Sequence, residues 1–178
     1  MSLYGLHRRC KALIRSLDIP SPFDVHALCQ NIAQQQGRPI QLKALAMPAG
    51  SPCGLWVSTA TNYYIFYEKQ ASPFHQEHII VHELGHLLCG HTTAAVMTDE
   101  TSRLLMPTLN PNMVERILQR THYSTPEEKE AEMIASLILQ GAERAPAGLN
   151  RPAPEADETI RRVRRLLVHR HERHPRIR

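Results

Sequence analysis

Apolar residues recur at helical spacing in the first part of the chain. A first stripe runs from Leu6 to Leu17 at intervals of three and four residues, which predicts an amphipathic helix that ends before the next proline. A second helix is predicted to begin with Ser21 as its N-cap and Pro22 in the first helical position, and to end at Gly37. The chain therefore opens with two helices that each bury one side.

The spacing of apolar residues changes after the second helix. Residues 40–45, 54–59 and 63–68 are short runs with a strand-like pattern, and clusters of Pro, Gly, Thr and Asn separate them. These runs predict three strands, and their short connections favour a small antiparallel sheet. A small sheet with flanking helices predicts an α+β fold.

A third helix is predicted from Ser72, as its N-cap, to about Cys89, with Gly90 as its stop. One side of this helix is apolar and is expected to face the core, whereas the other side collects histidines and predicts either chemistry or polar surface. The apolar side holds Ile80, Val81, Leu84, Leu87 and Leu88, and the histidine side holds His75, His78, His82, His86 and Cys89.

The histidine side contains an H-E-x-x-H motif, His82-Glu83-Leu84-Gly85-His86. Residues four apart on a helix lie one above the other, so the two imidazoles can converge on one metal ion. Zinc is the predicted ion, because it suits imidazole ligands and a catalytic zinc site combines three protein ligands with a water molecule. Glu83 is then placed to act as general base toward that water. The competing interpretation is a pair of surface histidines beside a solvated glutamate.

A zinc hydrolase needs a third protein ligand, and the nearest histidine does not fit the best-known extended motif. In H-E-x-x-H-x-x-G-x-x-H the glycine and the last histidine follow the second histidine by about three and six residues, whereas Gly90 and His91 follow His86 by four and five. We therefore predict that His91 belongs to the loop or cap at the end of the helix. The alternative ligand is a carboxylate from another helix.

The helix predicted over residues 125–140 offers carboxylates on two sides. Glu128 and Glu132 share one side, while Glu127 and Glu130 share the opposite side with several apolar residues. Both sides are partly apolar, so periodicity does not choose between them. Glu128, Glu132 and Glu130 all stay open as the third ligand at this point.

The composition fits one globular domain. The chain has 178 residues, of which 42% are apolar and 21% are charged, and these values argue against disorder, collagen and a coiled-coil rod. No apolar run approaches the roughly 18 residues that indicate a membrane span, and the first ten residues lack the apolar region of a signal peptide. The four cysteines form no Cys-x-x-Cys pair. We therefore expect a cytoplasmic protein without a membrane span.

The net charge of +4 is concentrated at one end of the chain. Residues 159–178 hold eight arginines and one glutamate, which leaves the rest of the chain at −3. Residues 141–158 are rich in Ala, Pro and Gly and predict a linker, and a short helix is predicted over residues 110–119. We expect a domain over residues 1–140, followed by this linker and by a basic tail.

Three segments together resemble the ImmA/IrrE-like metallopeptidase family. They run from Pro20 to Leu42, from Ile79 to His91 (IIVHELGHLLCGH) and from Glu127 to Leu139 (EEKEAEMIASLIL). The resemblance implies a compact zincin-like fold with bound Zn²⁺. It also implies intracellular endopeptidase activity, often against a helix-turn-helix repressor.

Carried onto this chain, the resemblance implies that His82 and His86 bind zinc and that Glu83 activates the water. The family's pattern of Glu, two residues, Ala and then Asn or Asp begins at Glu128, which is thereby implied as the third ligand. The pattern ends at Glu132, which replaces the usual short side chain. We expect this longer acid to hold the ring N–H of a ligand histidine.

Three further residues are candidates around the reaction. His122 and Tyr123 precede the helix that carries Glu128, and they are candidate donors to the oxyanion of the reaction. His78 lies one turn before His82 and is a candidate contact to substrate or metal. The strand over residues 63–67 is expected to be an edge strand with which an extended peptide pairs.

Two functional hypotheses follow from these observations. The first is a zinc endopeptidase that cleaves a regulatory protein, such as a DNA-binding repressor. The second is a regulator or adaptor that keeps the zincin-like fold but works by binding a partner, including DNA through the arginines from Arg161 to Arg178.

Overall fold

The computed structural model describes residues 2–47, 52–59, 61–91 and 123–144, and these residues form four helices and a three-stranded mixed sheet. The expected α+β class is therefore confirmed. The helix expected at residues 110–119, the basic tail and all but the first residues of the expected linker lie outside the described residues. The helices are α1 (Leu3–Ile14), α2 (Val25–Gln36), α3 (Pro73–Cys89) and α6 (Thr125–Arg144), and the strands are β1 (Ile40–Leu45), β2 (Gly54–Ser58) and β3 (Tyr63–Glu68).

The expectation of an antiparallel sheet is wrong for one of the two strand pairs. The strand order is β1-β3-β2, with β2 antiparallel to β3 and β1 parallel to β3. A tight turn, in which the Thr59 N–H donates to the Asn62 carbonyl at 2.9 Å, forces β2 and β3 to run in opposite directions. β1 and β2 lie on opposite edges of β3, and β1 runs in the same direction as β3. Periodicity reports which side of a strand is buried but carries no information on its direction.

Two helix ends differ from the sequence prediction. The helix expected from Ser21 begins instead at Val25, because the Asp24 side chain accepts a hydrogen bond from the Ala27 N–H at 2.7 Å and so caps α2. The last described helix continues to Arg144, four residues past the expected end of the domain at residue 140. The expected bounds of α3 are close to those observed, with Ser72 as N-cap and Gly90 as C-cap.

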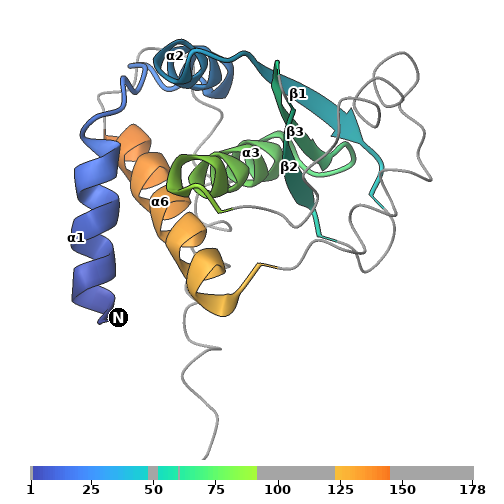
Figure 1. The fold of residues 1–178 in the computed structure, drawn as a ribbon. Helices are drawn as coiled ribbons and strands as arrows, with labels where there is room; N and C mark the ends of the chain where they lie inside the picture. The colour runs from blue at the N-terminus through green and yellow to red at the C-terminus, as the bar shows by residue number, and fades with distance from the viewer. Residues whose placement is uncertain (1, 48–51, 60, 92–122, 145–178) are drawn as a thin grey trace, which may run out of the picture. The chain divides into compact units, whose positions relative to one another are not determined.

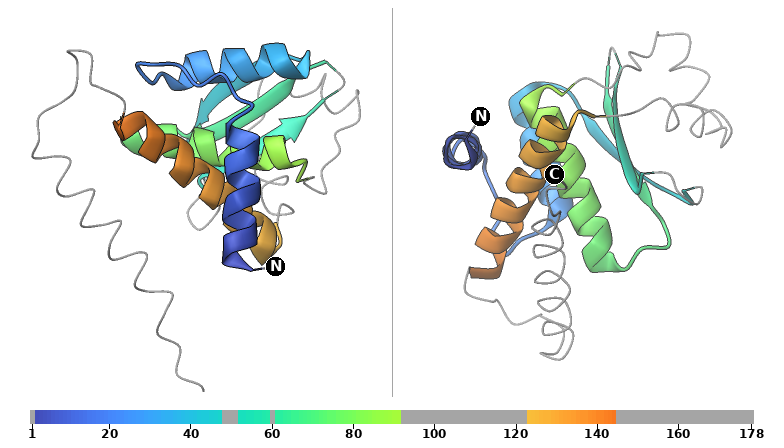
Figure 2. Two further views of the ribbon diagram at one scale, coloured as in Figure 1. Left: turned by 90° about the vertical axis from the view of Figure 1, so that its left-hand side faces the viewer. Right: turned by 90° about the horizontal axis from the view of Figure 1, so that it is seen from below.

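Helix α3 lies in the middle of a layered arrangement. Figure 1 and the right-hand view of Figure 2 show the sheet on one side of α3 and α6 on the other, with α1 beyond α6. Both sides of α3 are consequently buried: Val81 and Leu84 are 0% exposed on the core side, and His86 is 0% exposed on the histidine side. The histidine side of α3 is thus graded, from His75, which is exposed, to His86, which is buried where α3 contacts α6.

Glycine at position 85 lets α3 and α6 approach each other closely. A Cβ atom at Gly85 would lie 3.0 Å from the Cα and carbonyl oxygen of Ala131 in α6. These are backbone atoms, which cannot turn aside as a flexible side chain can. The glycine of the H-E-L-G-H sequence therefore sets the distance between the helix that carries the histidines and the helix that carries the glutamates.

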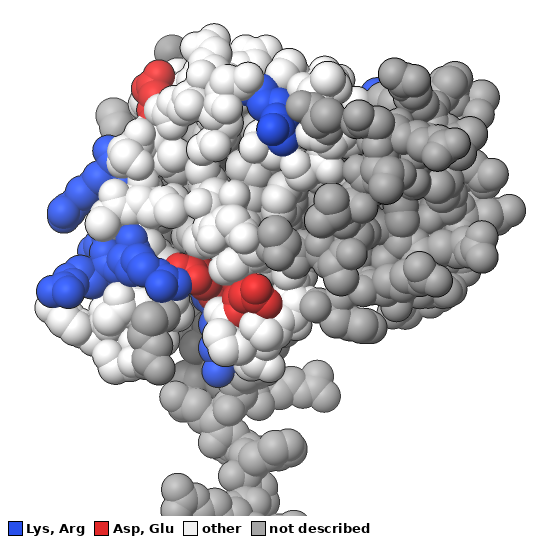
Figure 3. Space-filling model, viewed as in Figure 1, with Lys and Arg blue, Asp and Glu red and all other residues white. Residues whose placement is uncertain are grey.

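Helix α1 packs on the outer side of α6 through Leu6 and Cys10, which are both buried. On the face shown in Figure 3, the basic side chains gather over α1 and lie beside acidic side chains at the beginning of α6. The Arg9 guanidinium of α1 forms an ion pair with Glu130 of α6. Within the described residues, no helix is long and apolar enough to cross a membrane.

Candidate metal centre

His82, His86 and Glu128 present three ligand atoms to one point between α3 and α6. His82 Nε2 lies 3.1 Å from His86 Nε2 and 3.3 Å from Glu128 Oε2. His86 Nε2 lies 3.7 Å from Glu128 Oε1. Two nitrogens and a carboxylate oxygen at this spacing form a group that could hold a metal ion.

Glu83 lies beside this group but points toward the sheet. Its carboxyl accepts a hydrogen bond from the backbone N–H of Trp56 in β2, and Oε1 would lie 2.7 Å from a Cβ atom at Gly54. Glu83 is only 4% exposed, and Oε2 has no hydrogen-bond partner among the described residues. Burial, together with the negative charge of Glu128, raises the pKa of this carboxyl to about 7, although His82 and the Trp56 N–H act in the opposite direction. A buried carboxyl with a free oxygen is suited to exchanging a proton with a molecule in the adjoining cleft.

The two histidines of the motif have opposite electrostatic surroundings. Burial disfavours the charged form of His82, but a hydrogen bond to Glu132 and the charges of Glu83 and Glu128 outweigh it and raise the His82 pKa. For His86, burial and the neighbouring imidazoles of His82 and His91 act together and lower the pKa to about 3. His86 is therefore neutral at physiological pH, which is the form of imidazole that binds metal.

Glu132 links two histidines on the open side of the centre. Its Oε2 lies 3.2 Å from His78 Nε2 and 3.4 Å from His82 Nδ1, and we call these three residues the cleft cluster. Burial works against the charge of Glu132, but the hydrogen bonds from both histidines more than compensate and lower its pKa. Glu132 contacts the nitrogen of His82 that faces away from Glu128, a position from which an acid can orient the imidazole ring.

A cleft of about 350 Å³ adjoins the candidate metal centre. Three parts of the chain line it: the segment that leads into β2, helix α3, and the start of α6 with the preceding Tyr123. The lining residues are Pro52, Cys53, Gly54, His78, Ile79, His82, Glu83, Tyr123 and Glu128. The strand next to the cleft is β2, whereas β3 is the central strand of the sheet. The expectation that residues 63–67 form an edge strand is therefore wrong, because β1 and β2 occupy both edges of β3.

The Tyr123 ring stacks on the His86 imidazole, with 3.6 Å between ring centroids and 18° between planes. Its hydroxyl is buried and lies near the Trp56 indole without forming a hydrogen bond of good geometry. Burial, reinforced by Glu83 and Glu128, raises the Tyr123 pKa, so the hydroxyl keeps its proton. Tyr123 lines the cleft and keeps a hydroxyl proton that is free to donate, whereas His122 lies outside the described residues.

A second group of possible ligands lies on the closed side of His86. Cys89, His91 and Glu130 also place ligand atoms within 4.8 Å of one another. His91 Nδ1 is 3.0 Å from His86 Nδ1, and His91 Nε2 is 3.3 Å from Glu130 Oε2. Glu130 in turn accepts a hydrogen bond of 2.7 Å from Arg9 Nε. We call His91, Glu130 and Arg9 the inner cluster.

His91 follows the helix, as predicted, but it is not a surface residue, since it is only 7% exposed. Gly90 adopts a left-handed conformation with φ of 68°, and the His91 N–H donates to the His86 carbonyl at 3.0 Å. This cap turns the chain so that the His91 ring returns beneath His86. The signal that could have revealed it is a glycine followed by a histidine just past a helix that already carries two candidate ligand histidines.

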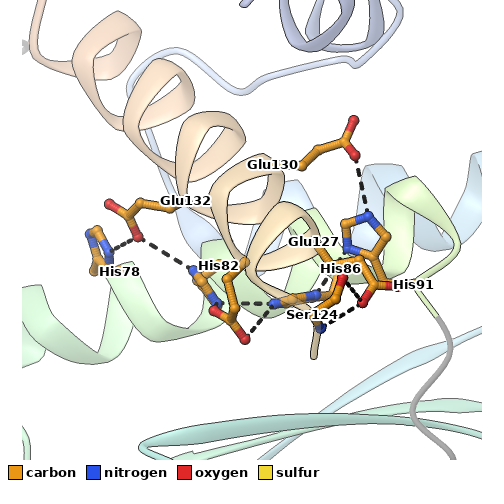
Figure 4. A network of polar contacts seen from close by, with 9 residues as sticks. His78, His82, His86, His91, Ser124, Glu127, Glu130 and Glu132 are labelled. Atoms are coloured by element: carbon orange, nitrogen blue, oxygen red, sulfur yellow. Dashed lines mark hydrogen bonds and ion pairs between the residues drawn. The ribbon is translucent and has the colours of Figure 1, made fainter. Parts of the chain in front are cut away.

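Figure 4 shows how the predicted residues come together. His78, His82, His86 and His91 form a row along α3, with Glu132 of α6 near one end and Glu130 near the other. Glu128 joins His82 and His86, Glu132 joins His78 and His82, and Glu130 stands apart from the first metal group. Arg9 was absent from the sequence-based candidates, because no local pattern links it to a glutamate 121 positions away.

Comparisons of the chain with protein-family models, with curated proteins and with solved structures find no match.

Proposed function

We propose that this protein is a zinc-dependent endopeptidase with a zincin-like fold, similar to the ImmA/IrrE-like metallopeptidases. The observation that carries the proposal is the convergence of His82, His86 and Glu128 beside a cleft that Glu83 also lines. Neither the H-E-x-x-H spacing nor the glutamates of α6 would suffice alone. Their meeting at one point joins two segments that the sequence separates by more than forty residues.

The donor atoms fit zinc better than a larger, oxygen-preferring ion. Zinc bonds imidazole nitrogen and carboxylate oxygen at about 2.0–2.2 Å, so two ligand atoms at tetrahedral positions lie about 3.3–3.5 Å apart. The separations of 3.1, 3.3 and 3.7 Å among the three ligand atoms are close to this value. Calcium and magnesium would call for oxygen ligands instead of two imidazoles.

Bound at these three residues, zinc would supply a Lewis acid that polarises a peptide carbonyl and acidifies a water molecule. Glu83 would take the proton of the attacking water at its free carboxyl oxygen and deliver it to the leaving amine. Tyr123, whose hydroxyl is protonated and lies at the cleft, would donate to the oxygen of the tetrahedral intermediate. The reaction is hydrolysis of a peptide bond without an acyl-enzyme.

The sheet beside the cleft suits an extended polypeptide as substrate. Strand β2 pairs with β3 on one side only within the described residues, and the cleft is lined by the segment that leads into β2. A peptide that pairs with the outer edge of β2 would run past Glu83 and the metal ligands. We propose that the substrate is an exposed segment of a regulatory protein, such as a DNA-binding repressor.

The deciding experiment combines zinc analysis with a cleavage assay for the parent protein and the Glu83→Gln variant. We expect one zinc per chain in both proteins, because Glu83 is not a ligand. Peptide cleavage in the variant should fall by about 10²–10⁴-fold, the usual contribution of a general base. Candidate substrates are an unfolded generic protein and the product of the neighbouring gene.

Glu77→Gln is the matched control, because Glu77 lies on the same helix but is surrounded by Asp24 and His26 rather than by the metal group. This variant should retain both zinc and activity. A Glu83→Gln protein as active as the parent would contradict the role of Glu83, and a parent protein that binds no zinc would contradict the whole proposal.

A further inference from the structure

We infer that His91 and Glu130 are positioning residues that hold the His86 ring in the one orientation and tautomer able to bind the metal. The inference rests on the metal site of the proposed function but not on its peptidase activity. It concerns the side of His86 that faces away from the cleft, where the described contacts form an unbroken line from His86 through His91 and Glu130 to Arg9.

The positions of the protons along this line follow from a single requirement. His86 Nε2 faces His82 and Glu128, so it must be free of hydrogen to bind a metal, and the ring hydrogen then sits on Nδ1. That hydrogen points to His91 Nδ1, 3.0 Å away, which must therefore act as acceptor. His91 consequently carries its own hydrogen on Nε2 and donates it to Glu130 Oε2, 3.3 Å away.

Arg9 completes the line by keeping Glu130 ionised. Its guanidinium donates to Glu130 Oε1, and the two groups form an ion pair. The negative charge of Glu130 polarises His91, so that His91 Nδ1 accepts more strongly from the Nδ1–H of His86. His86 Nε2 thereby becomes a stronger metal ligand.

His91 and Glu130 of the inner cluster are buried, whereas Arg9 is 56% exposed and the cleft cluster is open. His91 and Glu130 are each 7% exposed, and His86 is 0% exposed, so water does not compete for these bonds. The cap at Gly90 fixes the backbone of His91, and the packing of α1 on α6 brings Arg9 to Glu130. The orientation of one metal ligand is thus coupled to the docking of the N-terminal helix.

A second metal ion at Cys89, His91 and Glu130 is the competing interpretation of the same residues. It is less compatible with the contacts, because Glu130 is already neutralised by Arg9 and both ring nitrogens of His91 have hydrogen-bond partners. The Cys89 thiol is also poorly prepared to bind a cation, since burial and the nearby Glu130 raise its pKa to about 12. The two interpretations predict different metal stoichiometries.

The first test measures the zinc dissociation constant of the full chain by competition with a chelator. We expect His91→Phe, which keeps a ring but removes both nitrogens, to weaken zinc binding by about 10–100-fold. Glu130→Gln should weaken it less, by up to about tenfold, because an amide oxygen can still accept from His91. Glu77→Gln, the control on α3 outside both clusters, should leave the constant unchanged. Thermal unfolding in chelator shows whether each metal-free variant is folded.

His91→Asn separates orientation from the link to Glu130. The amide of asparagine takes the place of the Nδ1 position and can accept from His86, but it is too short to reach Glu130. We expect it to restore part of the affinity lost in His91→Phe. A merely space-filling role of His91 would give the opposite order, with the ring of Phe better tolerated than the smaller amide.

The second test needs no variant and reads the tautomers directly. In long-range ¹H–¹⁵N spectra of the zinc-loaded parent protein, His86 should carry its hydrogen on Nδ1 and His91 should carry its hydrogen on Nε2. The same tautomer on both rings would overturn the inference. So would zinc affinity in His91→Phe equal to that of the parent. Two zinc ions per chain, with one lost in Cys89→Ala, would establish the second metal site instead, and absence of zinc from the parent would overturn both this inference and the proposed function.

Discussion

The two histidines of the H-E-x-x-H motif lie one turn apart, yet one belongs to an open region and the other to a closed one. His82 is 20% exposed in its side chain and shares the cleft cluster with His78 and Glu132, whose carboxylate is half-exposed. His86 is fully buried between Tyr123 and the inner cluster. Glu132 contacts His82 directly and is half-exposed, whereas the buried Glu130 reaches His86 only through His91.

This difference shows that one motif can place two candidate ligands in surroundings with opposite effects on their pKa values. Negative charge dominates the surroundings of His82 and raises its pKa, whereas burial and neighbouring imidazoles lower the pKa of His86. Hydrogen bonds on the open side compete with water, and those on the closed side do not. We expect substitutions of His82 and of His86 to change the pH dependence of the unfolding free energy in opposite directions. At one pH, we expect substitutions of Glu132 and of Glu130 to lower the unfolding free energy by different amounts.

The largest expected effect is the pH dependence of stability in the metal-free protein. The folded-state pKa of His86 is lowered from 6.5 to about 3, so the folded state takes up this proton less readily than the unfolded chain. The stability that neutral His86 contributes is therefore complete above pH 6.5 and is lost as the pH falls toward about 3. A tenfold difference in proton affinity corresponds to about 1.4 kcal/mol, so the loss amounts to a few kcal/mol.

His82 provides the comparison for this prediction, because its pKa is shifted in the opposite direction. The stability that protonated His82 contributes is complete below pH 6.5 and is lost as the pH rises through the folded-state pKa of His82. Denaturant unfolding of the chelator-treated protein at several pH values measures both effects. His86→Gln should reduce the loss of stability on acidification, and His82→Gln should increase it; profiles that change in the same direction would contradict the contrast.

The next largest effect concerns Gly85, which both regions share. Alanine there would gain up to about 1 kcal/mol in helix propensity, but its Cβ would meet the Ala131 backbone at 3.0 Å. Overpacking costs about 1–3 kcal/mol, and pushing α3 from α6 would separate histidines from glutamates in both clusters. We expect Gly85→Ala to lose about 1–2 kcal/mol of unfolding free energy and also to bind zinc more weakly.

Gly141→Ala is the matched control for that substitution. Gly141 lies within α6, and a Cβ atom there would meet nothing within 4 Å among the described residues. The helix-propensity gain should therefore appear unopposed, as an increase of about 0.5–1 kcal/mol with unchanged zinc affinity. A gain of stability in both variants would show that α3 and α6 are not in close contact at Gly85.

The sequence predicted best those features that depend on local spacing. The three strands and the four described helices were expected close to where they lie, because caps such as Ser72 and Gly90 and the apolar stripes are local signals. The convergence of His82 with His86 followed from helix geometry alone. The direction of β1 and the place of β3 within the sheet were not predictable in this way, because strand pairing depends on contacts far apart in the chain.

The roles of the glutamates on α6 show the same limit at the site. Periodicity placed Glu128 with Glu132 and Glu127 with Glu130 on opposite sides but did not reveal which side meets α3. Both sides do in part, since Glu128 and Glu132 reach His82 while Glu130 reaches His91 around the end of α3. The inner cluster became visible only when the cap at Gly90 and the docking of α1 were both known.

The last comparison separates Glu132, which contacts the candidate ligand His82, from Glu130, which contacts His91 behind His86. Glu130→Ala would leave buried His91 without its acceptor and Arg9 without its ion pair, at a cost of about 1–3 kcal/mol of unfolding free energy in chelator. Glu132→Ala would remove contacts of a half-exposed carboxylate, worth about 0–1 kcal/mol. Denaturant unfolding at neutral pH measures the difference. Equal losses of unfolding free energy would mean that water competes for the hydrogen bonds of the inner cluster as well. The contacts behind His86 would then hold its ring no more firmly than the cleft cluster holds the ring of His82.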